Sequence, residues 1–172
     1  MTHRARPVHA PADAGAGAIT HAIDAALAAH RDQPGALLPV LHAIQDELGY
    51  LPEDTTARVA AGLNLSRADV HGVITFYSDF RTTPPGRHTL RLCRAEACQA
   101  MGAEALIAHL AAQHGAALGA TRADRALTAE PVYCLGLCAL APAAMLDGAL
   151  HGRLTRDRLD ALLAPLVDED AP

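Results

Sequence analysis

Apolar residues in the first half of the chain recur at the spacing of a helix face. Over residues 19–77 they return every third or fourth position, which predicts amphipathic helices. Breaks at Pro34-Gly35 and at Gly49 divide this stretch, as glycine and proline do at helix ends. Ser66, followed three residues later by Asp69, has the pattern of a helix N-cap. The first half therefore predicts four short helices packed as a small bundle.

The pattern changes after residues 81–86, Arg-Thr-Thr-Pro-Pro-Gly, a linker that two adjacent prolines stiffen. His88–Cys93 alternates between polar and apolar residues, as a half-buried strand does, and the Ala- and Leu-rich stretch Met101–His114 predicts a helix. The remaining expected elements are a strand over Leu127–Tyr133, two short strands over residues 143–148 and 149–154, and a helix that Thr155 caps and that runs to Leu163.

Together the two patterns predict an α/β protein with an N-terminal helical bundle. The bundle occupies residues 18–80, and an α/β domain of ordinary size occupies residues 87–167. Residues 1–17 are rich in Pro, Ala and Gly and lack the apolar region of a secretory signal. We expect them to form a disordered or loosely docked tail.

Composition narrows the kinds of partner. A net charge of −5, no Trp, two Phe and three Tyr disfavour a nucleic-acid partner, which needs surplus Lys and Arg and aromatic rings for stacking. No run approaches the roughly 18 apolar residues of a membrane-spanning helix, so we expect no direct membrane insertion and a cytoplasmic location. Thiols stay reduced in that compartment, where cysteines serve metals or chemistry rather than disulfides.

The four cysteines form two spaced pairs. Cys93 and Cys98 have the spacing C-x4-C, and Cys134 and Cys138 have the spacing C-x3-C. Both pairs lie just past the ends of expected strands, and adjacent strand ends would bring all four thiols to one loop region. Four thiolates are the usual ligands of [2Fe–2S] and [4Fe–4S] clusters, and Gly136 would let the backbone N–H groups approach cluster sulfides.

Spacing alone leaves three interpretations of these cysteines open. A structural zinc ion also takes four cysteines, although zinc modules favour C-x2-C knuckles, which neither pair has. Four buried cysteines without a metal are the second alternative. A thioredoxin-type dithiol is disfavoured because it requires C-x-x-C. An iron–sulfur centre, zinc and no metal all stay open on spacing alone.

Histidines and arginines offer further candidates. His42 and His71 lie in apolar helical stretches, where we expect core or interface hydrogen bonding, and His109 and His114 fall on a helix, where we expect exposure. No histidine has ligand spacing beside the cysteine pairs, so we expect none to bind the metal.

Charged and aromatic residues near the cysteines and the linker each allow two interpretations. Arg91 and Arg94 flank Cys93 and are either surface charges or a means of offsetting the negative charge of a cluster. Phe76, Tyr77 and Phe80 lie just before the linker, and they either close the core of the bundle or form a docking surface.

The order of these motifs resembles one known family. The segments LLPVLHAIQDELGYLP at residues 37–52, VHGVITFY at 70–77 and CLGLCALAP at 134–142, together with Cys93 and Cys98, are similar to the 24-kDa subunit family of NADH:quinone oxidoreductase. The resemblance runs from about residue 19 to residue 163. It implies a helical bundle followed by a thioredoxin-like [2Fe–2S] ferredoxin domain, in which Cys93, Cys98, Cys134 and Cys138 ligate one [2Fe–2S] cluster.

One feature of the first cysteine loop points to a particular branch of that family. The stretch CRAEACQAMG at residues 93–102 is similar to the gamma subunit of molybdenum-containing NAD-dependent formate dehydrogenases. The respiratory members usually carry a Gly-Thr pair inside this loop, and the pair is absent here. The resemblance thus favours a formate dehydrogenase complex whose catalytic subunit holds the molybdenum cofactor.

The expected role is electron transfer without a catalytic residue on this chain. Neither G-x-G-x-x-G after a strand nor G-x-x-x-x-G-K-[ST] occurs, so no nucleotide site is predicted. The resemblance implies that FMN and NAD are bound by a flavin-bearing, NADH-oxidising partner subunit. The alternatives are the equivalent subunit of a respiratory NADH dehydrogenase or an NAD-linked hydrogenase and, from another class, a zinc-stapled assembly module without redox chemistry.

Overall fold

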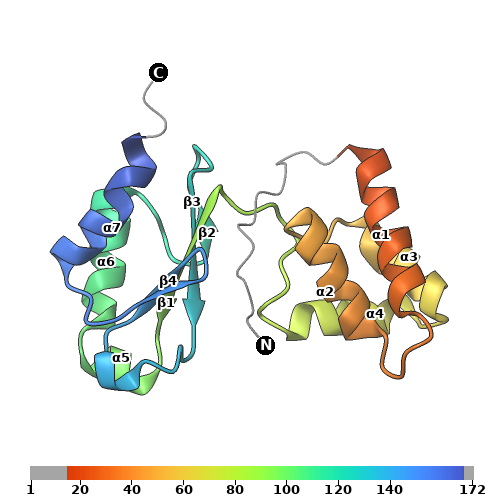
Figure 1. Cartoon of the computed structure of the whole chain (residues 1–172), viewed down its shortest axis with the longest axis horizontal. Helices are drawn as coiled ribbons and strands as arrows, with labels where there is room; N and C mark the ends of the chain where they lie inside the picture. Colours follow the sequence, from red (N-terminus) through yellow and green to blue (C-terminus); the bar gives the residue numbers. More distant parts are fainter. Residues whose placement is uncertain (1–14, 169–172) are drawn as a thin grey trace. The chain divides into compact units, whose positions relative to one another are not determined.

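In the computed structural model, which describes residues 15–168, the first half of the chain forms four helices, as the apolar pattern predicts (Figure 1). They are α1 (Ala16–His30), α2 (Leu37–Leu48), α3 (Asp54–Leu63) and α4 (Arg67–Phe76). The described residues divide into two units between Pro84 and Pro85, a boundary inside the expected linker. Of the expected tail, residues 1–14 lie outside the described residues, and residues 16 and 17 belong to α1.

Local signals in the sequence set the ends of these helices. Gly49 ends α2 with a φ of 79°, and Asn64 ends α3 with a φ of 53°, both in the left-handed conformation that these residues adopt most readily. Ser66 forms the expected cap of α4: its hydroxyl accepts from the Asp69 N–H at 3.1 Å, and the Asp69 carboxylate accepts from the Ser66 N–H at 3.1 Å. This reciprocal capping box satisfies two backbone donors at the start of α4.

The apolar stripes of the four helices meet in one core. Ile23, Val40, Leu41, Ile44, Val59 and Val70 are all fully buried. The side chain of Gln45 fastens α2 to the segment after α4, because its amide donates to the Asp79 carbonyl at 2.7 Å and accepts from the Arg81 N–H at 2.9 Å.

The second unit is built on a mixed sheet. Its elements are β1 (His88–Cys93), α5 (Glu96–Ala100), α6 (Ala103–His114), β2 (Ala120–Thr121), β3 (Leu127–Val132), the short 3₁₀ helix η1 (Cys138–Leu140), β4 (Ala144–Leu146), β5 (Ala149–His151) and α7 (Arg156–Asp168). The strand order is β2-β3-β1-β4-β5, and β1 and β3 are its parallel neighbours. Every other pairing in the sheet is antiparallel.

Helices α6 and α7 lie side by side on one face of this sheet (Figure 1). Leu90 and Leu92 of β1 share a buried core with Leu110 of α6 and with Leu159 and Leu163 of α7. Thr155 caps α7 as expected, since its hydroxyl accepts from the Arg158 N–H at 3.2 Å.

The sequence pattern misses three elements of the second unit and misplaces several ends, since β3, β4 and β5 are also shorter than expected. α5, β2 and η1 are each five residues or shorter, too short to show a periodicity. α6 begins at Ala103 rather than Met101, because Gly102 has a φ of 92° that breaks the helix. α7 continues to Asp168, past the expected end at Leu163.

Candidate metal centre

The sheet brings both cysteine pairs to one edge. Cys93 is the last residue of β1 and lies opposite Val132, the last residue of β3. Because β1 and β3 are parallel neighbours, the loops that follow them start side by side. Cys98 lies in α5 and Cys138 begins η1, and these two short helices contact each other. The expectation that adjacent strand ends gather the four thiols is confirmed.

Direct contacts join the thiols within each pair. The Sγ atoms of Cys134 and Cys138 are 3.7 Å apart, and the Gly136 N–H donates to Cys134 Sγ at 3.4 Å. The side chains of Cys93 and Cys98 also interact, which lowers the pKa of Cys93 and raises that of Cys98. Each loop therefore presents its two sulfurs together.

Backbone N–H groups from both loops converge on Cys93. Burial opposes ionisation of this thiol most strongly, but hydrogen bonds from the Ala95 N–H, the Cys98 thiol and the N–H groups of Cys134 and Leu135 outweigh burial. The pKa of Cys93 is consequently lower than its ordinary value. Since two of these donors belong to the loop of the other pair, Cys93 ties the two loops together.

The pKa shifts of Cys98 and Cys138 show that the thiols share one electrostatic environment. Burial raises the pKa of Cys98, as do its hydrogen bond to Cys93 and the charges of Cys93 and Cys138. The hydrogen bond to Cys134 raises the pKa of Cys138, and the charge of Cys134, burial and the charge of Cys93 add to it. Thiolates crowded in this way repel one another, and cations bound between them relieve that repulsion.

The separation of Cys134 and Cys138 is that of two thiolates on one metal ion. Two thiolates on a tetrahedral ion with bonds of about 2.3 Å lie about 3.8 Å apart, close to the observed separation of Cys134 and Cys138. Among the residues described, one group of three or more potential ligands has all its ligand atoms within 4.8 Å of one another, and it contains no cysteine. A binuclear [2Fe–2S] cluster takes one such pair of thiolates on each iron.

The two pairs differ in exposure. Cys93 and Cys98 are 3% and 2% exposed and pack among small apolar residues, whereas Cys134 and Cys138 are exposed. Cys134 also has a φ of 111°, a strained conformation for a residue with a Cβ atom, and Gly136 follows at 75°. Cys93 and Cys98 are therefore the inner pair, and Cys134 and Cys138 are the outer pair.

The two arginines beside Cys93 are engaged elsewhere. Arg91 Nε donates to Glu130 at 3.0 Å, and Arg94 donates to Glu104 at 2.9 Å. Each guanidinium charge is thus paired with a carboxylate, which favours the interpretation as surface charges over the offset of a cluster's charge.

The structure contradicts the expected core position of two histidines and the expected exposure of two others. His42 and His71 are exposed rather than in the core, because they lie on the outer faces of α2 and α4, and His42 packs against the ring of Phe80 with centroids 4.9 Å apart. His109 and His114 are not exposed: their side chains are 15% and 14% exposed, because both turn toward Asp160 of α7. The sequence carries no sign of that partner, which is 46 residues from His114.

Of the aromatic residues before the linker, only Phe80 takes the expected place in the core of the bundle. Phe80 is buried in the helical core, whereas Phe76 is 80% and Tyr77 is 43% exposed. The rings of Phe76 and Tyr77 meet edge to face, with centroids 5.1 Å apart.

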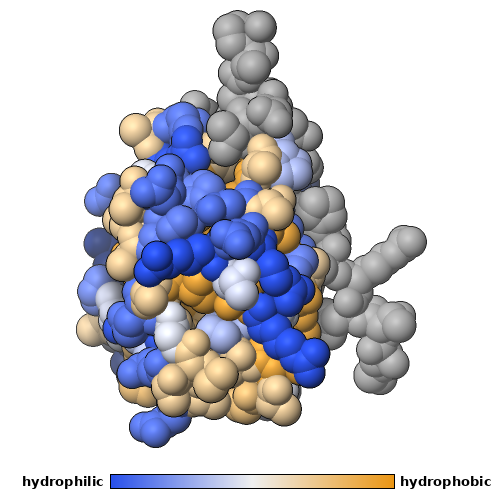
Figure 2. Space-filling model, turned by 90° about the vertical axis from the view of Figure 1, so that its left-hand side faces the viewer, coloured by the Kyte–Doolittle hydropathy of each residue, from blue (hydrophilic) through white to orange (hydrophobic). Residues whose placement is uncertain are grey.

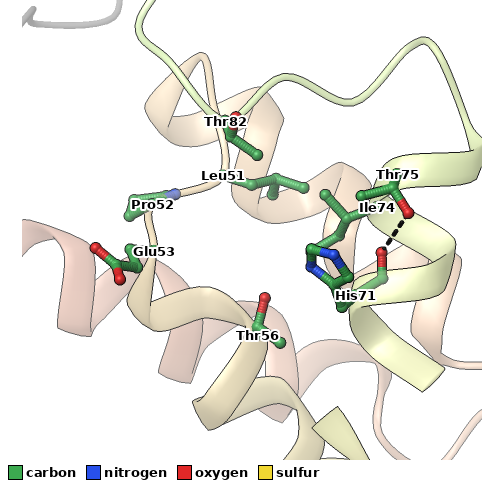
Figure 3. Close-up of a pocket in the computed structure, with 8 residues that line it drawn as sticks. All are labelled: Leu51, Pro52, Glu53, Thr56, His71, Ile74, Thr75 and Thr82. Atoms are coloured by element: carbon green, nitrogen blue, oxygen red, sulfur yellow. Dashed lines mark hydrogen bonds between the residues drawn. The ribbon is translucent and has the colours of Figure 1, made fainter. Parts of the chain in front are cut away.

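The helical unit also contains a small hollow of about 240 Å³ (Figure 3). Its walls come from the start of α3, from α4 and from the segments on either side of them, and they are formed by Leu51, Pro52, Glu53, Thr56, His71, Ile74, Thr75 and Thr82. The Thr75 hydroxyl in its wall donates to the His71 carbonyl at 2.9 Å. The hollow is smaller than the roughly 300 Å³ at which small-molecule sites begin, and we assign it no function.

Comparison with known proteins agrees with this geometry. The model of the family described as thioredoxin-like [2Fe-2S] ferredoxin matches residues 23–167. A subunit of an NADH-quinone oxidoreductase of Rhizobium meliloti is 41% identical over 141 residues, which cover 82% of this chain and 84% of that protein. The NADP-reducing hydrogenase subunit HndA of Solidesulfovibrio fructosivorans is 32% identical over 130 residues, 76% of either chain.

A solved structure shows the same fold. The crystal structure of an NAD+-reducing [NiFe]-hydrogenase in the air-oxidised state matches with a TM-score of 0.66 and 29% identity. The match covers 82% of this chain and 24% of that chain, so this protein corresponds to about a quarter of the hydrogenase polypeptide. The expected fold class, a helical bundle followed by a thioredoxin-like domain, is confirmed, and the chain belongs to the thioredoxin-like [2Fe-2S] ferredoxin family.

Proposed function

We propose that this chain is an electron-transfer subunit that holds one [2Fe–2S] cluster on Cys93, Cys98, Cys134 and Cys138, within an NAD-linked oxidoreductase complex. The observation that carries the proposal is the arrangement of two close thiol pairs at the shared edge of β1 and β3. Membership in a [2Fe-2S] family supports the identity of the cluster.

The chemistry of NADH calls for a partner subunit. A [2Fe–2S] cluster carries one electron at a time, whereas NADH gives up a hydride, and a flavin is the usual converter between the two. The sequence contains no nucleotide-binding motif. The FMN and NAD sites therefore belong to a flavin-bearing, NADH-oxidising subunit in this proposal, and the location is cytoplasmic. Over residues 15–168 the structure has no helix with the length and apolar character to cross a membrane.

The exposure of the thiols suits such a relay. The inner pair, Cys93 and Cys98, is held in the apolar interior, and the outer pair, Cys134 and Cys138, faces outward. A donor or acceptor on a partner can therefore approach the outer pair, while the inner pair keeps the loops in place.

The relatives favour the respiratory or hydrogenase type of complex. Those named above are subunits of an NADH-quinone oxidoreductase and a hydrogenase, so these alternatives have better support than formate dehydrogenase. One observation still favours a formate dehydrogenase with a molybdenum-bearing catalytic subunit, namely the missing Gly-Thr pair in the loop from Cys93 to Cys98. The test is to purify the native complex through this chain and to assay three reactions. NAD+ reduction with formate indicates a formate dehydrogenase, NAD+ reduction with hydrogen indicates a hydrogenase, and NADH oxidation with quinone indicates a respiratory complex.

The cluster itself is tested on the purified chain. We expect brown protein with two iron and two sulfide per chain and, after reduction with dithionite, a rhombic EPR signal that integrates to one spin per chain. Cys134→Ala removes the cluster and leaves the helical unit folded by far-UV circular dichroism, whereas Met101→Ala, at an exposed site between α5 and α6, keeps it. A colourless chain with one zinc ion and no EPR signal would instead support the zinc-stapled assembly module.

A further inference from the structure

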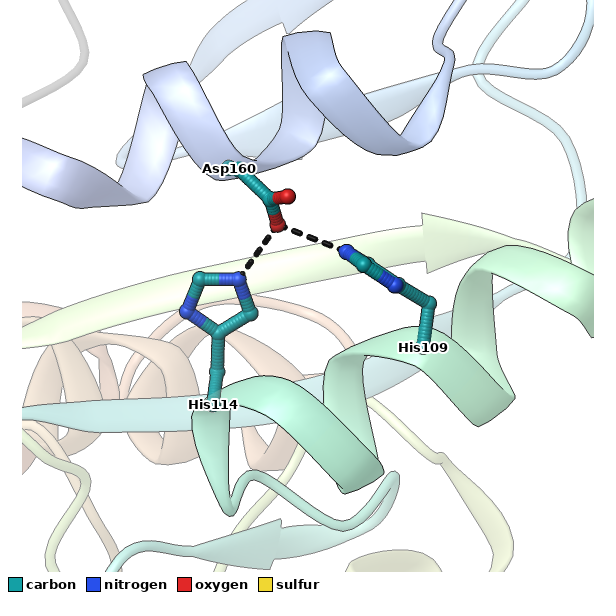
Figure 4. A group of neighbouring side chains, drawn as sticks. All are labelled: His109, His114 and Asp160. Atoms are coloured by element: carbon teal, nitrogen blue, oxygen red, sulfur yellow. Dashed lines mark hydrogen bonds and ion pairs between the residues drawn. The ribbon is translucent and has the colours of Figure 1, made fainter.

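Three side chains of the types that bind metals meet between α6 and α7 (Figure 4). His109 and His114 belong to α6, and Asp160 belongs to α7. The Nε2 atoms of both histidines lie 2.7 Å from the same Asp160 oxygen, Oδ1. The two imidazole rings face this oxygen from different sides, with centroids 6.0 Å apart and planes at 69°.

The group is half-enclosed rather than spread over the surface. The two histidine side chains are 15% and 14% exposed, and that of Asp160 is 44% exposed. Figure 2 shows a side of the molecule on which hydrophilic and apolar side chains are mixed. The apolar contact between the two helices and the sheet is made by other residues, among them Leu110, Leu159 and Leu163. The three polar side chains therefore form a separate group between the two helices.

The donor atoms are close to the arrangement of a tetrahedral ion. Ligands bound at about 2.0–2.1 Å to tetrahedral zinc lie about 3.3–3.4 Å apart. In this group all ligand atoms lie within 4.8 Å of one another, and two of the three separations are 2.7 Å. Shifts of less than about 1 Å in side chains that already face one another would place an ion at equal distance from all three. The half-exposed carboxylate leaves the fourth position to water.

The charge state of the group also suits a cation. Hydrogen bonds from His114 and His109 lower the pKa of Asp160, so its carboxylate is ionised. Where an Nε2 atom donates to Oδ1, it carries the proton of that hydrogen bond. Transfer of that proton to Nδ1 by tautomer exchange frees the Nε2 lone pair for a metal.

We propose that His109, His114 and Asp160 form a second metal site, which takes a divalent ion of the zinc type and clamps α6 to α7. Two imidazoles and one carboxylate select Zn²⁺, or its substitutes Co²⁺ and Ni²⁺, over Mg²⁺ and Ca²⁺, which prefer oxygen ligands. The site lies between helices that support the sheet carrying the cysteine loops. Its role is structural, because its ligands come from α6 and α7 and an ion holds both to one point.

The test is zinc binding by the full chain loaded with its cluster. Titration with Zn²⁺ is followed by metal analysis after dialysis, and the visible absorption of the cluster shows that iron stays in place. We expect one zinc ion per chain. His114→Gln and Asp160→Asn weaken its binding by about 100-fold or more, a loss larger than that typical of changes to residues that only support a ligand. The control, His21→Gln on the exposed face of α1, binds zinc as the wild type does.

X-ray absorption at the zinc edge distinguishes this site from the cysteines. The proposal requires a first shell of nitrogen and oxygen only, and a sulfur shell would overturn it. If the chain carries no iron cluster, zinc on the four cysteines persists in His114→Gln, while zinc on the proposed site is lost, so the two proposals fail separately. Zinc binding that is unchanged in both variants would also refute the second site.

Thermal unfolding gives a readout that does not depend on the variants. At a free Zn²⁺ concentration of 100 times its dissociation constant, the ratio of folded to unfolded α/β unit rises about 100-fold, and EDTA reverses the rise. An unfolding temperature that is the same with Zn²⁺ and with EDTA would contradict a clamp between α6 and α7.

Discussion

Replacing Gly152 by alanine should damage the metal centre from outside the cysteine loops. Gly152 follows β5, and a Cβ atom there would lie 2.7 Å from Leu140 Cβ and 3.0 Å from the Leu140 carbonyl oxygen. The same carbonyl accepts a hydrogen bond from the Arg153 N–H at 2.5 Å, which holds this part of the backbone close to Gly152. Leu140 ends η1, the helix that begins with Cys138. The substitution therefore presses on the segment that positions an outer thiol.

The expected effect of Gly152→Ala on the rate of cluster loss follows from these distances. An ordinary contact begins at 3.4 Å, so Leu140 Cβ must move by about 0.7 Å, and it cannot rotate away because it is attached directly to the backbone. Metal–ligand distances tolerate about 0.2 Å. Overpacking of this kind costs about 1–3 kcal/mol. If opening of the loop relieves the strain, the cluster is lost about 5- to 150-fold faster.

The assay is the loss of visible absorption when the iron-loaded chain is held with an excess of an iron chelator. Gly72→Ala is the matched control: it makes the same chemical change inside α4, where a new Cβ atom meets nothing within 4 Å. We expect the control to keep the half-life of the wild type and to stabilise the helical unit by up to about 1 kcal/mol, because alanine favours helix. Equal half-lives for Gly152→Ala and the wild type would refute the reasoning.

Three further predictions concern stability, measured by urea unfolding with far-UV circular dichroism. Ser66→Ala destabilises the helical unit by about 1 kcal/mol through loss of the cap of α4. Hydrogen bonds from the Ser66 hydroxyl and then its N–H lower the pKa of Asp69, so its contribution is present above the unfolded-state pKa and is lost as pH falls through the lower folded-state pKa. Ser66→Ala should therefore flatten the acid limb of stability against pH, and an unchanged limb would contradict this assignment. Gln45→Ala removes two hydrogen bonds to the segment after α4 and costs about 1–3 kcal/mol, whereas a loss below about 0.5 kcal/mol would show that this bridge is replaced by water. Leu110→Ala, at a fully buried site between α6 and the sheet, costs about 2–5 kcal/mol in the α/β unit, and a smaller loss would mean that the site collapses around the gap.

The cysteine loops illustrate what sequence pattern can establish about this protein. The strand ending at Cys93 and the strand before Cys134 were recognisable from their composition, and a helix between them made a parallel pairing of their strands reasonable. From that pairing the meeting of the four thiols follows. The division into an inner and an outer pair does not, because it depends on how α5 and η1 pack, and segments of three to five residues carry no periodic signal.

The histidine group marks the limit of the same approach. His109 and His114 are five residues apart, a spacing that does not place two side chains on one helix face. They meet only because His114 is the last residue of α6 and because Asp160 of α7 supplies a common partner. The contact between α6 and α7 is tertiary. The hydrophobic pattern of each helix predicts that helix but not which helix packs beside it. The sequence shows two histidines near the end of one helix. They indicate a possible metal site only once the structure places Asp160 beside them.

Unequal burial of the two cysteine pairs explains how one site can be both rigid and accessible. Cys93 belongs to the central strand, and its thiol receives N–H groups from the loop of the outer pair, so the core fixes the position of both loops. Cys134 has a strained backbone conformation, and its N–H is one of the groups that bond to the Cys93 thiol. The outer thiols can then face solvent without losing their geometry. A relay needs this combination, because a partner must come close to the cluster while the ligands change position little between its two charge states.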